Sequence, residues 1–270
     1  NAKSEQELRA ALEAGVGTIV VDNLSELILL DQLAGEAGRV QSVLLRVTPG
    51  VDSHTHEFIS TGQLDSKFGF AVEEILGGVA KQAEDSPNID LRGFHYHVGS
   101  QLHDNSSHIM ATEIVLNMLS ELKEKNGYEA REINCGGGFG VHYAGDPQRT
   151  TVSYFMDPVM KLIDRFCSEH GLVRPTVTIE PGRWVVGEAG ITLYEVCSVK
   201  TNAAGRTYIG VDGGFPDNPR PELYDAKYEV EAVEKHGEPY DQLVTVAGKC
   251  CESGDIVAWD VKLPELERGD

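Results

Sequence analysis

The feature that most constrains the fold is a regular alternation of short β-rich runs with longer amphipathic stretches over the first 180 residues. The β-rich runs lie at 18–21, 42–47, 91–98, 132–135 and 176–180. Stretches with helical periodicity lie at 25–37, 72–83, 107–125 and 152–170. Such alternation is typical of parallel β/α architecture, because two parallel strands need a long crossover connection between them.

Polar or glycine-rich residues follow the strands, at 48–49, 99–101, 136–140 and 181–183. Chemistry at the carboxyl ends of parallel strands is the habit of a (β/α)₈ barrel. Five units are visible where a barrel has eight, so we expect an internal fragment, with roughly 75–90 residues missing upstream. A five-stranded flavodoxin-like sheet is the alternative.

After about residue 190 the pattern changes to β-rich runs at 191–200, 206–211 and 242–246, without long helices between them. This favours a second, mostly β domain, whose sheet looks unfinished at the last residue. The predicted organisation is therefore α/β. A partial (β/α)₈ barrel over residues 1–190 precedes a partial β domain over 191–270.

The composition of the chain limits the classes of partner that it can bind. The formal charge of −20 makes nucleic acid a poor partner, since phosphate binding needs basic patches. No apolar run approaches the ~18 residues that a membrane span needs. The five cysteines are odd in number and widely spaced, which is unlike a disulfide framework and favours a reducing cytoplasm.

Two segments in the first part of the chain carry candidate chemistry. The glycine run 136–140 follows a strand and lets backbone N–H groups approach a phosphate, although a tight loop without a ligand is the alternative. Its spacing is not the dinucleotide pattern. His95 and His97 share one face of their strand, with His103 nearby, so a metal site is an alternative to a flat cofactor stacked on His97.

Other candidates are charged or nucleophilic. Glu180 precedes Arg183 by three residues across a Pro-Gly turn, as a structural ion pair or as a ligand site. Cys251 and Glu252 place a thiol beside a carboxylate, although a buried, inert cysteine is the usual alternative. The segments at 67–69 and 220–224 have ordinary loops as their alternative.

In this order, the segments resemble the fold-type III pyridoxal-phosphate decarboxylases. The matching pieces are Ile59-Ser60-Thr61-Gly62, Lys67-Phe68-Gly69, His97-Val98-Gly99-Ser100-Gln101, Gly136 to Gly140, Glu180 to Arg183, Arg220 to Tyr224, and Cys251 to Asp255. The resemblance covers nearly the whole chain and implies an alanine-racemase-like barrel followed by a β domain.

The resemblance implies pyridoxal 5′-phosphate as cofactor and assigns roles to individual residues. His97 would stack on the pyridine ring, and Glu180 would keep the pyridine nitrogen protonated, so that the ring accepts electrons. The remaining cofactor-binding residues would be Ser100, Gly137, Gly138, Pro181, Gly182 and Arg183. The substrate's far end would meet Arg183, Arg220, Tyr224 and Glu252. Cys251 would protonate the carbanion across the interface of a homodimer with shared active sites.

The implied reaction is decarboxylation of meso-diaminopimelate to L-lysine and CO₂, the last step of lysine biosynthesis. Glu252 favours this substrate over ornithine-like diamines, for which related enzymes carry aspartate. The family's cofactor-binding lysine has no match in this chain, so we expect the fragment alone to be inactive. The alternatives are decarboxylation of ornithine, arginine or carboxynorspermidine, or a non-catalytic homologue that binds a partner.

Overall fold

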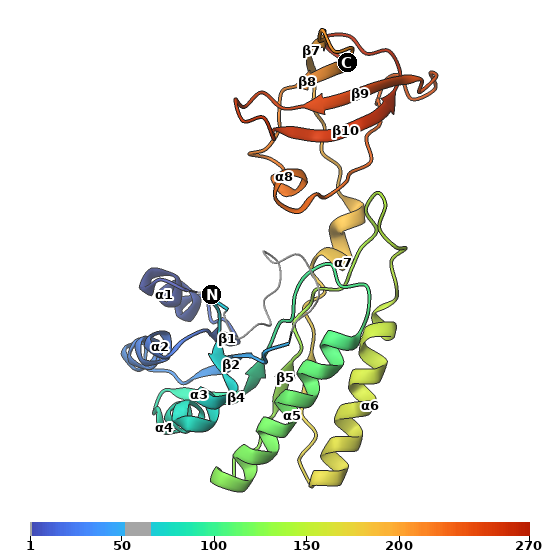
Figure 1. Ribbon diagram of the computed structural model, residues 1–270. Helices are drawn as coiled ribbons and strands as arrows, with labels where there is room; N and C mark the ends of the chain where they lie inside the picture. Colours follow the sequence, from blue (N-terminus) through green and yellow to red (C-terminus); the bar gives the residue numbers. More distant parts are fainter. Residues whose placement is uncertain (1, 52–65) are drawn as a thin grey trace. The chain divides into compact units, whose positions relative to one another are not determined.

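A computed structural model describes residues 2–51 and 66–270 of the chain (Figure 1). The chain divides into two compact units. The first comprises Asn1–Gly140 with Arg149–Gly187, and the second comprises Val141–Gln148 with Glu188–Asp270. The short excursion at 141–148 was not expected from the sequence. It moves eight residues that directly follow the glycine run into the second unit.

The first unit is built on a parallel sheet. Its strands are β1 (Thr18–Val21), β2 (Gln41–Thr48), β3 (Phe70–Ala71), β4 (Ile89–His95), β5 (Glu132–Asn134) and β6 (Thr176–Thr178). The order is β1-β2-β4-β5-β6, with β3 beside β2, and every pair is parallel. A flavodoxin-like sheet would reverse its order at a switch point. These strands instead follow one another as in a barrel wall, and over the described residues the sheet does not close.

Helices lie along the outside of this sheet (Figure 1). They are α1 (Glu5–Glu13), α2 (Leu24–Glu36), α3 (Val72–Glu74), α4 (Ala80–Asp85), α5 (Ser106–Asn126) and α6 (Val152–His170), with a π-helical turn η1 (Ile75–Val79) between α3 and α4. The short helix α7 (Arg183–Val186) and the 3₁₀ turn η2 (Gly187–Ala189) follow β6. The predicted helix at 72–83 is therefore broken into three pieces, because Gly78 adopts φ 138°.

Local sequence sets several helix ends. Ser4 and Glu7 form a capping box at the start of α1, and Asn23 accepts a hydrogen bond from the Glu26 amide at the start of α2. α5 ends at a left-handed glycine, Gly127. The strand β2 is buried at all but one position, which is the pattern of a parallel strand covered on both faces.

The second unit contains a four-stranded sheet with the order β10-β9-β8-β7. Its strands are β7 (Val196–Thr201), β8 (Thr207–Val211), β9 (Gln242–Ala247) and β10 (Ile256–Leu263), and the short helix α8 covers Arg220–Tyr224. β8 and β9 run parallel, and the other two pairs are antiparallel.

Two sequence-based predictions needed correction in the second unit. The strand predicted over 191–200 begins only at Val196, because the residues before it do not pair with β8 and Ile191 is 86% exposed. The strand β10 was not predicted. No helix of the described residues is long and apolar enough to cross a membrane.

Candidate active site

Polar side chains gather at the carboxyl ends of the parallel strands in the first unit. Asp22 directly follows β1, Arg46 lies in β2, His95 ends β4, Asn134 ends β5 and Glu180 follows β6. Because all five strands are parallel, these ends meet at one edge of the sheet. All but Glu180 are buried, so the fold brings costly polar groups into its interior at this edge.

Glu180 is the half-exposed member of this group. Its Oε2 lies 3.3 Å from His95 Nε2, and its Oε1 accepts a hydrogen bond from Asn134 Nδ2 at 2.9 Å. The hydrogen bond with His95 is the largest cause that lowers the pKa of Glu180 to about 2, against the opposing effect of partial burial. Glu180 is therefore a carboxylate at any pH near neutral, with half of its side-chain surface exposed.

His97 lies just past the end of β4 and is neutral. Burial, followed by the charge of Arg46, lowers its pKa to about 4. The Gly137 amide donates a hydrogen bond to His97 Nδ1 at 3.2 Å, so that nitrogen carries no proton. The ring is thus held in one tautomer, with its proton on Nε2.

The glycines of the run 136–140 are packed so tightly that none of them could carry a side chain without a shift of its neighbours. A Cβ on Gly138, which has φ 90°, would lie 2.1 Å from the carbonyl oxygen of Gly99. A Cβ on Gly137 would lie 2.0 Å from the carbonyl oxygen of Glu180. The glycines therefore bring the loops after β4, β5 and β6 together. Binding of a phosphate by the glycine run remains a prediction. The Gly137 amide already donates its hydrogen bond to His97.

Arg183 opens α7 and reaches back to the loop after β4. Its Nη2 donates to Ser100 Oγ at 3.1 Å and its Nη1 to Gln101 Oε1 at 3.2 Å. Gly182 in the Pro-Gly turn has φ 35°, which permits the reversal from β6 into α7. Ser100 and Arg183, predicted to share the cofactor site, are thus in direct contact.

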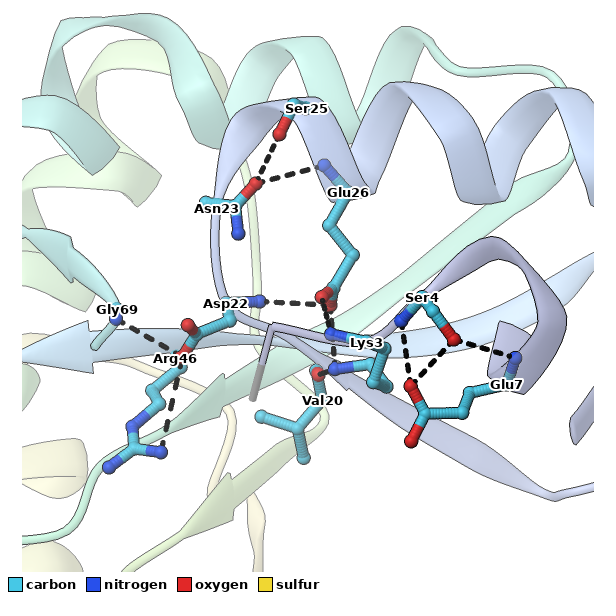
Figure 2. Close-up of polar contacts among 10 residues, drawn as sticks. All are labelled: Lys3, Ser4, Glu7, Val20, Asp22, Asn23, Ser25, Glu26, Arg46 and Gly69. Atoms are coloured by element: carbon cyan, nitrogen blue, oxygen red, sulfur yellow. Dashed lines mark hydrogen bonds and ion pairs between the residues drawn. The ribbon is translucent and has the colours of Figure 1, made fainter. Parts of the chain in front are cut away.

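Sequence reasoning missed Asp22 and Arg46, which Figure 2 draws. Arg46 Nη1 lies 3.9 Å from Asp22 Oδ1, and the Gly69 amide donates to the same oxygen at 3.2 Å. The Arg46 guanidinium also sits over the ring of Phe68, 4.5 Å from its centroid. The segment at 67–69, predicted as a loop, is therefore fixed to the ends of β1 and β2. An arginine inside the apolar run of β2 was the available signal.

The same network extends to the start of the described chain. The buried carboxylate of Glu26 accepts the Asp22 amide at 3.2 Å and pairs with Lys3 Nζ at 2.6 Å (Figure 2). Lys3 Nζ also donates to the Val20 carbonyl at 2.7 Å. These contacts fix the turn between β1 and α2 and so hold Asp22 in place. The matching motif at 59–62 lies outside the described residues.

In the second unit, a buried aspartate organises the thiol-bearing turn. Asp255 Oδ2 accepts the Cys250 amide at 2.7 Å, and Oδ1 accepts the Phe215 amide at 2.5 Å. Cys251 and Glu252 are exposed on this turn, with Sγ 3.7 Å from Oε2. Cys251 is therefore not buried, as its alternative reading had it, and its role as a proton donor stays a prediction. The sequence placed Asp255 in the segment from Cys251 to Asp255 but did not predict its structural role.

The helix α8 packs against the same turn. A Cβ on Gly254 would lie 2.1 Å from Glu222 Oε2, so the glutamate side chain lies directly over this glycine. Arg220 and Tyr224, at the two ends of α8, lie together, with the guanidinium 5.3 Å from the ring centroid. The helix that carries Arg220 and Tyr224 thus lies against the turn that carries Cys251 and Glu252. Among the residues with described positions, no group of three or more side chains has the arrangement of a metal site.

Comparison with known proteins defines the class of protein. Residues 1–187 match the family model described as the pyridoxal-binding domain of pyridoxal-dependent decarboxylases. The chain therefore belongs to the pyridoxal-dependent decarboxylase family. This confirms the resemblance drawn from the motifs.

Within this family the chain is similar to diaminopimelate decarboxylases. It is 44% identical over 279 residues to the enzyme of Bacillus subtilis (strain 168) and 42% identical over 271 residues to that of Bacillus methanolicus. These alignments cover 100% of this chain and 62% and 63% of the relatives. The chain thus spans just under two thirds of their length.

Solved structures agree. The diaminopimelate decarboxylase of Helicobacter pylori complexed with L-lysine superimposes with a TM-score of 0.86 at 30% identity, covering 100% of this chain and 64% of that one. The enzyme of M. jannaschii in co-complex with L-lysine gives 0.84 at 33% identity, covering 100% and 61%. The predicted fold class, a barrel-type sheet followed by a β domain, is confirmed.

Proposed function

We propose that the protein to which this chain belongs is a pyridoxal 5′-phosphate-dependent decarboxylase that converts meso-diaminopimelate to L-lysine and CO₂. The observation that carries the proposal is the pairing of two site halves in one chain. One is the ionised Glu180 with a neutral His97, and the other is the exposed Cys251–Glu252 pair on the turn against which α8 packs. The 44% identity to a diaminopimelate decarboxylase supports the choice of substrate.

The residues of the first unit fit the cofactor. A protonated pyridine nitrogen needs an anionic partner, and Glu180 is ionised and half exposed. A flat ring needs a flat neighbour, and the His97 imidazole is neutral and fixed in orientation by Gly137. When bound, pyridoxal phosphate supplies the electron-accepting ring that stabilises the carbanion formed on loss of CO₂.

Arg183 and the loops at the carboxyl ends of the strands in the first unit would hold the cofactor phosphate and part of the substrate. Arg183 is a cation fixed to Ser100 and Gln101, in the loop whose Gly99 lies against Gly138 of the glycine run. Its planar fork suits a phosphate or a carboxylate. We assign Ser100, Gly137, Gly138 and the Pro181–Gly182 turn to cofactor binding, and Arg183 to the boundary between cofactor and substrate.

The second unit would recognise the amino-acid end that does not react. Arg220 with Tyr224 suits its carboxylate, and Glu252 suits its ammonium group. The carbon that loses CO₂ must gain one proton, and the exposed Cys251 thiol would donate it. We also propose a homodimer, in which this turn completes the active site of the partner subunit.

The test is CO₂ release by the protein as its native gene encodes it, loaded with pyridoxal 5′-phosphate. Meso-diaminopimelate should be preferred over ornithine, arginine and carboxynorspermidine by at least about tenfold in kcat/KM. Glu252→Asp should reduce that preference, because the shorter carboxylate no longer reaches the same ammonium group. Preference for another amino acid would replace the substrate assignment, and absence of any CO₂ release would favour the non-catalytic, partner-binding alternative.

A further inference from the structure

Tyr143 lies in the short segment that leaves the glycine run and groups with the second unit. It is half-buried there, and its ring meets the ring of Tyr228 edge-on at 5.4 Å between centroids. It stands 77 residues before Arg220 in the sequence, yet its ring centroid lies 5.4 Å from the Arg220 guanidinium. None of the sequence motifs includes this tyrosine.

Arg220 therefore contacts two tyrosine rings, Tyr143 at 5.4 Å and Tyr224 at 5.3 Å. Its Nε is buried and has no hydrogen-bond partner. Among the described residues no carboxylate pairs with this guanidinium, although the chain has 43 acidic residues against 23 lysines and arginines. Aromatic faces stabilise a guanidinium without using its N–H donors.

We propose that Tyr143 is a positioning residue that, with Tyr224, holds the Arg220 guanidinium for the carboxylate of the substrate's unreacting end. A guanidinium fixed in plane can offer two parallel N–H donors to a carboxylate, and one that swings about its stem cannot hold that geometry. This inference rests on the proposed function, because it deepens the assignment of Arg220. Tyr143 acts through Arg220 and not on the reacting carbon.

The inference separates ligands that carry a carboxylate from those that lack one. Tyr143→Leu should raise KM for meso-diaminopimelate and the inhibition constant for L-lysine about tenfold, which lies between the values of an exposed and a desolvated cation–π contact, and should leave kcat within about twofold. The inhibition constant of cadaverine, which has no carboxylate, should not change. Tyr143→Phe keeps the ring and should stay within about twofold of wild type on every measure.

The control repeats Tyr143→Leu in a protein that already lacks the Arg220 guanidinium. In an Arg220→Met background, Tyr143→Leu should weaken L-lysine binding no further, because the group that it positions is gone. An equal loss of L-lysine and cadaverine binding would overturn the inference, since a general packing role predicts that result. An undiminished Tyr143→Leu effect in the Arg220→Met protein would overturn it as well.

Failure of the proposed function looks different. If the wild-type protein neither releases CO₂ from meso-diaminopimelate nor binds L-lysine, the substrate assignment fails. The contact itself is then judged by thermal unfolding of the single and double variants. If the double variant lowers the midpoint by less than the sum of the two single variants, the contact between Tyr143 and Arg220 is supported. If the shifts add, the contact is overturned.

Discussion

Replacing Asp255 with asparagine tests whether this buried carboxylate holds the Cys251–Glu252 turn. The substitution keeps the shape of the side chain but leaves one oxygen where two now accept the amides of Cys250 and Phe215. A hydrogen bond to a charged group contributes about 1.5–3 kcal/mol, and a neutral one about 0.5–1.5 kcal/mol. One bond is lost and the other becomes neutral, so local stability should fall by about 2–4 kcal/mol.

Hydrogen exchange of the segment 248–255 measures this quantity directly. A loss of about 2–4 kcal/mol corresponds to exchange about 30- to 1000-fold faster in the Asp255→Asn protein. The matched control is Asp260→Asn, whose carboxylate is 57% exposed in a surface pair with Arg206. That control should change local stability by less than about 1 kcal/mol.

The same variant has an expected effect on activity. A turn that no longer holds Cys251 in place should lower kcat for meso-diaminopimelate by about 10- to 100-fold, because proton donors depend on their position. Exchange in Asp255→Asn within about threefold of wild type would refute the assignment of Asp255 as the organiser of this turn.

Three further predictions concern the first unit. The unfolding free energy should fall by up to about 3 kcal/mol as pH drops from 6.5 toward 4, because over this range the histidine is protonated in the unfolded chain and neutral in the folded one. His97→Gln should flatten this slope in chemical unfolding. Gly138→Ala should lower the thermal midpoint by at least about 5 °C more than Gly127→Ala, since both have positive φ but only Gly138 faces a carbonyl oxygen. Arg46→Met should cost about 3 kcal/mol and raise the pKa of His97 in an NMR titration, whereas Arg9→Met, in an exposed pair, should leave both the stability and that pKa unchanged.

The alternation of β-rich and amphipathic runs predicted the parallel strands of the first unit, except for the two-residue β3. The helix α6 begins at Val152 and ends at His170, as the sequence indicated, since Thr151 caps its start and Gly171 ends it. The broken helix at 72–85 was not predictable from apolar spacing, because that spacing continues through Gly78. β10 was missed because Trp259 and Asp260 interrupt the apolar alternation of the strand.

Candidate site residues could be proposed from the sequence where motifs are local. Glu180, His97 and Cys251 were proposed because each belongs to a recognisable segment, and their roles stay predictions. Asp22 and Tyr143 were not, because their roles come from partners far away in the chain, at Gly69 and Arg220. A single charged or aromatic residue gives no sign of such a partner until the fold brings the two together.

The parallel pairing of β8 with β9 has a geometric consequence for the second unit. Two parallel neighbours leave the sheet at the same edge, so the loop that follows Val211 emerges beside the turn that follows Ala247. Asp255 can therefore reach Phe215 in one loop and Cys250 in the other. The connection from β8 to β9 must run back along the full length of the strands and can vary in length. The connection from β9 to the antiparallel strand β10 is short. Insertions in the long connection could reshape recognition of a ligand while the thiol-bearing turn keeps its position.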